Sequence, residues 1–376
     1  MKWRMFICAI CFLIGGCSLN IPLEDQFSDP DAITDVLSAR SLLASAYKAM
    51  PQQIFQLSVL SDDFCPSQHL NKDMSLQGLY NWREVEMTEL AGTLWAGYYA
   101  VIAEVNALLA RIDAVVTLDE TEKLEKMRIV CEAKALKSWC YFDLLRLFAP
   151  RYEGNENKDG IILKKRVELD FLPRSSVKEC VTEIRTLLNE ARNVDNTQKN
   201  VYWLSDKAVA YLQVELELYA GNYPAVLELT KDLETEYPES VLGADVYKYL
   251  WSSENSDARI FGKYQLEQIY MDIRFDTFEK GDYLVLSQNV DYEEEDIRKE
   301  WSEIPFVMPD AKNVRLLGKY NKMNRDKVAS KYVNVARAAG MWLMRVEALA
   351  RSGKEGDAVA LANRMLKQRG ATEWST

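Results

Sequence analysis

The stretch that decides the fold is DKAVAYLQVELELYAGNYPAVLELTKDLETEYP, residues 206–238. Its first half carries an apolar residue at every third or fourth position, which is the spacing of an amphipathic helix. These apolar positions are Val209, Leu212, Leu216 and Tyr219. Gly221 follows at a place where a left-handed residue ends a helix, and Pro224 stands where a second helix starts. The stretch therefore predicts two helices joined by a tight turn.

The turn between these helices, residues 218–223, is similar to the turn of a tetratricopeptide repeat, in which pairs of helices stack on one another. A comparable pair is predicted near the end of the chain, at 341–351 and 357–368. The long helix that ends at Phe148 is expected to pair with 177–191 in the same manner. We therefore expect a mainly α-helical, tetratricopeptide-like scaffold.

Capping signals place the starts of the other helices. Asp29-Pro30 offers an N-cap followed by proline at the first helical position, and this helix is expected to run to about Met50. Residues 117–120 and 176–179 both have the capping-box pattern, in which Thr or Ser is followed three residues later by Glu. The first box opens a long helix, which Pro150 ends.

Residues 245–330 differ in character from the helical segments around them. They are rich in Tyr, Trp and Phe, and they contain the acidic run 291–296. The short alternating stretch 283–286 is expected to form a strand, and most of the remainder is expected to be ordered loop. We therefore expect a long loop-rich, aromatic insert on the helical frame, and loops in such positions usually carry function.

The first 16 residues have the features of a bacterial lipoprotein signal peptide. Two basic residues precede a short apolar run, and the small residues Gly15-Gly16 precede Cys17. We expect cleavage to leave Cys17 as the first residue, with its thiol carrying a lipid. Residues 17–28 are then expected to be a tether, and 29–376 to be the folded domain.

Composition and charge restrict the classes of partner. The 376 residues are 48% hydrophobic and 27% charged, as in a folded globular body. The net charge is -11, and an acidic body repels phosphate, so no nucleic acid is expected as a partner. Beyond the signal, no stretch approaches the roughly 20 apolar residues that span a bilayer. We therefore expect the N-terminal lipid to be the only membrane attachment.

The sequence contains no convincing catalytic or metal-binding constellation. His69 is the one histidine, which excludes a histidine-based metal cluster, and no glycine-rich phosphate loop occurs. The acidic run 291–296 lacks the alternating ligands and the glycine of an EF-hand loop. The cysteines after Cys17 lack the spacing of a zinc site, and we expect small buried side chains. They are Cys65, Cys131, Cys140 and Cys180. We therefore expect no enzymatic activity, no metal and no cofactor.

Aromatic residues in the expected loops are the candidates for ligand contact. They are Tyr80, Trp82, Trp251 and Tyr283. The first two fall in residues 51–87, which are expected to be irregular, and the others fall in the 245–330 insert. Flat rings on loops can stack on sugar rings or on peptide side chains. The alternative is that each ring only fixes its loop to the scaffold.

Five features follow one another along the chain in a recognisable order. They are Cys17, the helical run Leu94–Asn106, the run Glu132–Phe148, Asp296-Ile297-Arg298 followed by Lys319-Tyr320, and Arg337 followed by Leu343–Gly353. Each feature is weak alone, but the ordered set resembles the SusD/RagB family of outer-membrane lipoproteins and spans nearly the whole chain.

The resemblance implies a lipoprotein anchored in the outer membrane of a Bacteroidetes bacterium and facing the extracellular side. Such a protein binds an oligosaccharide, delivers it to a SusC-like TonB-dependent transporter and is not an enzyme. The resemblance also implies that aromatic residues on a loop-rich face contact the ligand. A peptide ligand in the same role, a structural lid without its own ligand site, and a glycoside hydrolase are the alternatives.

Two features depart from the family pattern. Phe148-Ala149-Pro150 stands where family members usually have Phe-Gly and a later proline. Family members also usually continue well past the last helical pair, whereas this sequence reaches Thr376 soon after Gln368-Arg369-Gly370. We therefore expect a short or C-terminally truncated member of the family.

Overall fold

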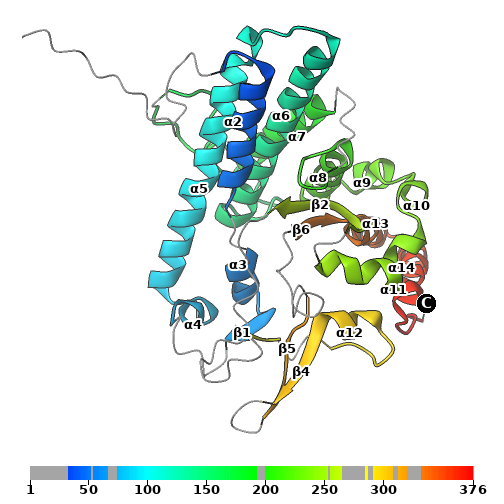
Figure 1. Ribbon diagram of the computed structural model, residues 1–376. Helices are drawn as coiled ribbons and strands as arrows, with labels where there is room; N and C mark the ends of the chain where they lie inside the picture. Colours follow the sequence, from blue (N-terminus) through cyan, green and yellow to red (C-terminus); the bar gives the residue numbers. More distant parts are fainter. Residues whose placement is uncertain are drawn as a thin grey trace, which may run out of the picture.

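The computed structural model is mainly helical, with a small β region at one end (Figure 1). The structure describes residues 33–51, 54–66, 74–168, 170–192, 200–252, 255–264, 284–286, 291–307, 312–319 and 332–375. The expected signal peptide, Cys17 and the expected tether therefore lie outside the described residues.

Four helices pack lengthwise and form the first part of the scaffold (Figure 1). They are α2 (Val36–Ala49), α5 (Glu84–Arg111), α6 (Glu120–Phe148) and α7 (Val177–Ala191). Nearly every residue of α6 from Cys131 to Leu145 is buried. A helix that is buried all round occupies the centre of a fold, so α6 is the axis on which the other three pack.

The helix pairs predicted from the sequence are confirmed. They are α6 with α7, α8 (Asp206–Tyr219) with α9 (Tyr223–Leu229), and α13 (Ala338–Arg351) with α14 (Glu355–Arg369). Gly221 and Gly353 occupy the two tight turns with φ of +69° and +72°, a conformation that glycine adopts without strain. The scaffold is therefore mainly α and tetratricopeptide-like. The second helix of the middle pair is interrupted, and α10 (Leu233–Glu236) continues it after Thr230.

The first residues of the helices show which of the predicted capping residues the structure uses. The capping box at Ser176 is confirmed, because its side chain and that of Glu179 each bond the other's backbone N–H. Asp119, and not Thr117, caps α6, with its carboxylate accepting from the Glu122 N–H at 2.8 Å. The first described helix starts at Val36, because Asp35 caps it. Asp29-Pro30 lies outside the described residues.

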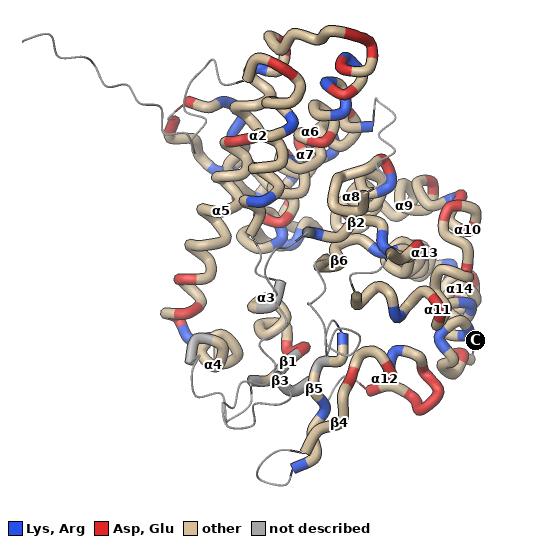
Figure 2. The backbone as a smooth tube through the Cα atoms, viewed as in Figure 1, with Lys and Arg blue, Asp and Glu red and all other residues tan. Residues whose placement is uncertain are grey.

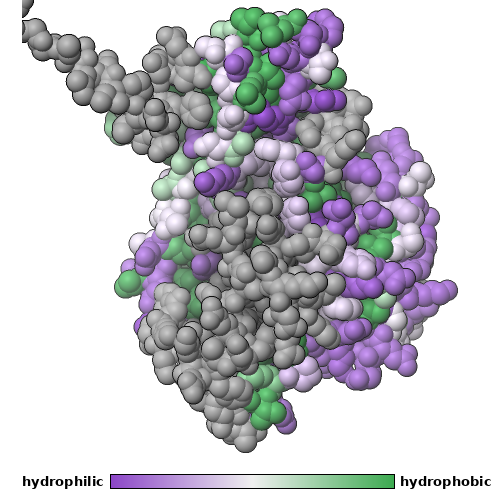
Figure 3. Space-filling view, in the orientation of Figure 1, coloured by the Kyte–Doolittle hydropathy of each residue, from purple (hydrophilic) through white to green (hydrophobic). Residues whose placement is uncertain are grey.

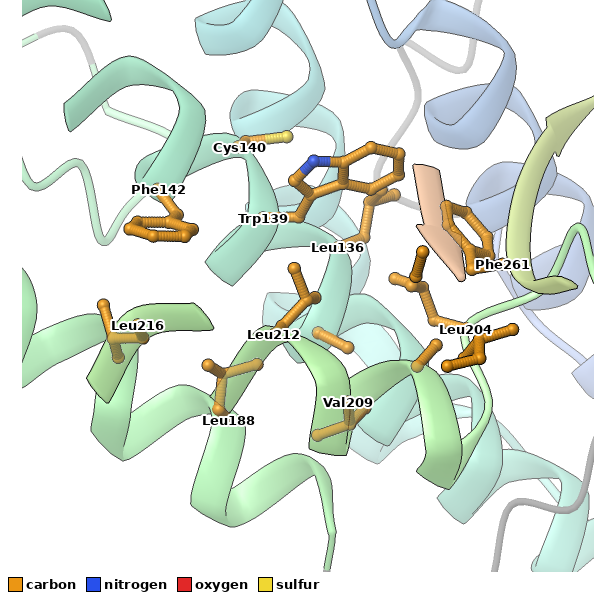
Figure 4. Packing of buried hydrophobic residues seen from close by; sticks show 14 of the residues in the cluster. Leu136, Trp139, Cys140, Phe142, Leu188, Leu204, Val209, Leu212, Leu216 and Phe261 are labelled. Carbon is orange, nitrogen blue, oxygen red and sulfur yellow. The ribbon is translucent and has the colours of Figure 1, made fainter. Parts of the chain in front are cut away.

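Large aromatic side chains link the helices in a continuous core. The Trp139 ring of α6 packs edge-on against Phe261 of β2 (Arg259–Tyr264), with ring centroids 5.0 Å apart (Figure 4). Trp342 of α13 is fully buried, and its Nε1 donates to the Tyr237 carbonyl at 3.0 Å. Losing a buried ring of this size typically costs about 3–5 kcal/mol, so these contacts hold the helix pairs together.

The 245–330 insert contains more regular structure than expected. Its elements in the described ranges are η3 (Lys248–Trp251), β2, β3 (Leu284–Leu286), α12 (Ile297–Ser302), β4 (Glu303–Val307) and β5 (Asn313–Leu317). The strand expected at 283–286 is confirmed over Leu284–Leu286. It lies in an antiparallel sheet of order β1-β3-β5-β4, whose first strand is β1 (Phe64–Pro66). A second sheet pairs β2 with β6 (Tyr332–Arg337).

The segment expected to be irregular, 51–87, is partly helical. It contains α3 (Ile54–Leu60) and α4 (Met74–Tyr80), and α5 already begins at Glu84. The remaining short elements are η1 (Ile112–Ala114), η2 (Glu239–Leu242) and α11 (Ala244–Tyr247). Short helices of this kind depend on tertiary contacts rather than on their own propensity, which is why periodicity did not identify them.

One described stretch, Glu84–Ala114, is long and apolar enough by length and composition to cross a membrane. This differs from the expectation that no stretch after the signal has that character. Its buried residues face α2 and α6, including Leu94, Val101 and Val105. The apolar residues of this stretch therefore belong to the protein core.

Candidate functional site

Tyr80 and Trp82 lie together at the corner where α4 meets α5 (Figure 1). Tyr80 is the last residue of α4 and is half-buried. The Cys65 thiol of β1 donates to its hydroxyl at 3.2 Å. Cys65 is itself half-buried, whereas the other three described cysteines are buried as predicted. Tyr80 therefore ties the corner to the small sheet.

Trp82 is held in an uncommon backbone conformation with its ring in solvent. Its φ is +54°, and its side chain is 64% exposed. The turn around it is closed by backbone bonds from Trp82 N to the Leu79 carbonyl at 3.0 Å and from Arg83 N to the Gly78 carbonyl at 2.9 Å. A bulky residue with positive φ is rare, and such strain concentrates at sites of function.

Trp251 is placed differently, at the end of η3, with only 5% of its surface exposed. Its ring packs edge-on against Tyr247, with centroids 5.6 Å apart. Lys319 Nζ lies 4.9 Å from the centre of the ring, and Arg337 Cζ lies 5.5 Å from it. A ligand could stack on this ring only after a neighbouring side chain moves, so ligand contact at Trp251 stays a prediction.

The four predicted aromatic residues do not form one group in the described structure. Tyr80 and Trp82 share the corner between α4 and α5 (Figure 1), whereas Trp251 is the last residue of η3, which follows α11. Tyr283 lies outside the described residues. Two grooves, of about 580 and 690 Å³, lie along α7 and are lined by none of the four residues.

The acidic run 291–296 is engaged within the fold. Figure 2 shows it as a group of acidic residues in the loop that leads into α12. Glu293 accepts two bonds from Thr372, and Asp296 caps α12 while binding Arg298 through both carboxylate oxygens. Within the described ranges, no group of three or more acidic, His or Cys side chains is arranged to hold a metal ion.

A feature that sequence reasoning missed is a group of cations around Tyr247 and Trp251. We call Arg298, Lys319, Arg337 and Arg369 the cationic cluster. Arg298, Lys319 and Arg337 belong to motifs of the family resemblance, and Arg369 lies near the end of the sequence. These segments are far apart along the chain, and only the fold brings them together. Arg369 Cζ lies 4.4 Å from the centre of the Tyr247 ring.

Burial, together with the neighbouring cations, lowers the pKa values of two members of the cationic cluster, Lys319 and Arg369. Burial is the main cause that lowers the pKa of Lys319 to about 8, and Arg337, Arg298 and Arg369 add to it, opposed by Asp63. Burial, with Arg298 and Arg337 beside it, likewise lowers the pKa of Arg369 to about 10. The cationic cluster therefore carries more positive than negative charge in an environment with little contact with solvent.

Comparison with family models shows which proteins the sequence resembles. Residues 23–214 match a SusD-like family described as starch-binding and associating with the outer membrane. This match covers half of the chain. No curated protein matches the sequence.

Solved structures from Bacteroides species share the fold. A putative sugar binding protein from Bacteroides vulgatus is 18% identical with a TM-score of 0.73, over 90% of this chain and 79% of that one. A SusD superfamily protein from Bacteroides thetaiotaomicron is 15% identical with a TM-score of 0.71, over 91% and 83%. NanU of B. fragilis is 15% identical with a TM-score of 0.67, over 93% and 80%. At such identities the likeness establishes the fold alone.

Proposed function

Because this chain belongs to the SusD-like family, we propose that it binds an oligosaccharide at the cell surface and delivers it to a SusC-like TonB-dependent transporter. The observation that carries the proposal is the family match, whose description names starch binding and the outer membrane. The sugar-binding description of a structural relative supports the ligand class. The role is binding and transfer without chemical conversion of the ligand.

The corner formed by Tyr80 and Trp82 is the part of the described structure best suited to contact a sugar. Trp82 offers a large exposed ring on a turn that is fixed by backbone hydrogen bonds. A rigid aromatic face loses little conformational entropy when a flat apolar sugar face stacks on it. Tyr80 holds the base of this turn through Cys65.

Calorimetric titration of an oligosaccharide panel tests this site. We expect Trp82→Ala to weaken binding by about tenfold, which corresponds to about 1.4 kcal/mol. Trp374→Ala is the matched control, since that ring is also exposed, at 59%, but lies after α14. Equal affinities for wild type and Trp82→Ala would remove this corner from the site, and failure of every saccharide to bind would overturn the proposed function.

We further propose that a lipid on Cys17 anchors the protein in the outer membrane and that the folded domain faces the extracellular side. Exposed apolar residues gather at the end formed by the starts of α2 and α6 (Figure 3). They are Leu37, Val116, Leu118, Leu124 and Met127. The chain enters the fold there, since Val116 N donates to the Thr34 carbonyl at 3.4 Å. An apolar end where the described chain begins supports contact with a partner or a membrane.

The alternatives give different results in the same experiments. A peptide ligand would be indicated by peptides that bind more tightly than all saccharides and still depend on Trp82. A structural lid would be indicated by co-purification with a TonB-dependent barrel together with no measurable ligand binding. Turnover of any glycan would favour a glycoside hydrolase.

A further inference from the structure

The cationic cluster gathers four cations from four separate parts of the chain. Arg298 lies on α12, Lys319 follows β5, Arg337 ends β6, and Arg369 ends α14. Lys319 and Arg337 both lie within 5.5 Å of the centre of the Trp251 ring. Arg369 contacts Tyr247, whose ring is 5.6 Å from that of Trp251, so the four side chains converge on one place.

The negative charge in this place is much smaller than the positive charge. Asp296 is engaged by Arg298, with two Nε contacts of 2.9 and 3.0 Å. Across the described ranges, no carboxylate lies within ion-pair distance of Lys319, Arg337 or Arg369. Asp63 raises the pKa of Lys319, although the two side chains do not form an ion pair.

Arg369, whose guanidinium lies over the Tyr247 ring, has a buried polar atom for which the described residues offer no hydrogen-bond partner. The residue is only 7% exposed, and its buried Nη1 has no hydrogen-bond partner. Leaving a charged donor buried and unpaired is costly, so proteins normally pair such groups. The hydroxyls of Tyr247 and Ser302, 3.2 Å apart, lie beside it and add further polar groups.

We propose that the cationic cluster is an anion subsite that receives the carboxylate of an acidic oligosaccharide, such as one containing uronic acid. Planar guanidinium groups match a carboxylate with two parallel hydrogen bonds, and Arg337 and Arg369 supply two such groups. Lys319 and Arg337 are half-buried and Arg369 is buried, which gives the subsite an outer and an inner part. This subsite rests on the proposed function and specifies its substrate class.

The test compares ligands that differ only in charge, with full-length protein in detergent. We expect trigalacturonate to bind about tenfold more tightly than neutral trigalactose in calorimetry. Lys319→Gln and Arg369→Gln are each expected to reduce this preference by about tenfold. Lys367→Gln is the matched control, since it removes an exposed positive charge from the same helix as Arg369 and is expected to leave the preference unchanged.

The preference should also depend on pH. Lys319 is the titrating group, and the groups that face it are Arg298, Arg337, Arg369 and Asp63. Because Lys319 gains its proton as pH falls below about 8, trigalacturonate is expected to bind more tightly at pH 7 than at pH 9. The Lys319→Gln variant should lose this difference, which a loss of fold would not produce selectively, and thermal melting of each variant reports on folding.

Each outcome separates this inference from the proposed function. Equal affinities for the acidic and the neutral saccharide overturn the inference and leave the proposed function standing. Tighter binding of a triglutamate peptide than of trigalacturonate assigns the subsite to polypeptide carboxylates and overturns the saccharide assignment. Stabilisation by inorganic sulfate alone, with no saccharide bound, overturns both.

Discussion

At the scale of single residues, Trp82 combines an exposed aromatic ring with an unfavourable backbone conformation. Its φ of +54° lies in the left-handed region, where a residue with a Cβ is disfavoured by about 1–2 kcal/mol. Glycine is free of that cost, so a residue chosen only for stability at this turn would be glycine. A tryptophan in its place, 64% exposed, agrees with the proposal that its ring contacts a ligand.

Replacing Trp82 should therefore separate stability from binding. We expect Trp82→Gly to keep or raise the free energy of unfolding, by up to about 1 kcal/mol, while ligand affinity falls. Trp82→Val should destabilise the fold, because β-branched residues are least suited to positive φ. Chemical denaturation of both variants measures the difference. A loss of stability in Trp82→Gly as large as that in Trp82→Val would contradict this explanation.

Lys263 is a second residue whose environment has a measurable consequence. Its ammonium group donates to the carbonyls of Met50 and Pro51, the latter at 2.9 Å, and so joins β2 to the end of α2. Burial lowers the pKa of Lys263 to about 7, although Cys140 and Asp143 oppose the shift. Lys263 therefore loses its proton at a lower pH in the folded protein than in the unfolded chain, where lysines titrate near 10.4.

This difference sets the sign of a pH effect. Between about pH 7 and pH 10 the unfolded chain holds more protons at Lys263, so the free energy of unfolding rises with pH by up to about 1.4 kcal/mol per unit. Lys263→Met should remove this contribution and flatten the curve. The pKa values of Lys137 and Lys319, each about 8, act in the same direction, so the comparison is between variant and wild type. Parallel curves would show that Lys263 does not titrate in this range.

At the scale of elements, caps and turn glycines explain where helices begin and end better than periodicity does. Ser176 and Glu179 bond each other's backbone and start α7 at the predicted residue. At α6 the Thr117 box is displaced by Asp119, since an ionised carboxylate is a stronger acceptor at a helix start than a hydroxyl. The sequence shows capping patterns at both helix starts. Where the Thr117 and Asp119 signals overlap, only the structure shows which residue caps α6.

The Ser176 cap gives the prediction at this scale. We expect Ser176→Ala to lower the free energy of unfolding by about 1 kcal/mol, because it leaves helix N–H groups without an acceptor. Thr186→Ala, on an exposed face of the same helix, removes only a bond to the Thr182 carbonyl and should be nearly neutral. Urea denaturation measures both, and equal losses would show that the cap is not what stabilises the start of α7.

At the scale of the whole molecule, the described chain begins at the apolar end of the fold. The described chain starts at Ile33 beside that end, and the 16-residue step from Cys17 to Ile33 reaches at most about 58 Å. If Cys17 carries the proposed lipid, so short a tether keeps the folded body close to the membrane. The corner at Trp82 lies at the far end of α5 from the apolar end (Figure 1).

The anchor can be tested on the whole protein. We expect Cys17→Ala to shift the protein from the membrane fraction to the soluble fraction, because a thiol is needed to carry the lipid. Saccharide affinity should be unchanged, since the folded domain is intact. Cys65→Ala is the control for loss of a cysteine and should leave the protein on the membrane. Retention of Cys17→Ala on membranes in high salt would contradict lipid anchoring.

The sequence by itself determined the helical scaffold and its family, because helix period, caps and turn glycines are local and are read within a few residues. It identified the exposed Trp82 as a candidate, but not its left-handed backbone, nor that Trp251 is buried between cations. It did not show that Arg298, Lys319, Arg337 and Arg369 meet, since they lie up to 71 residues apart in sequence. Only the tertiary structure decided these points, because burial and charge proximity depend on which distant segments pack together.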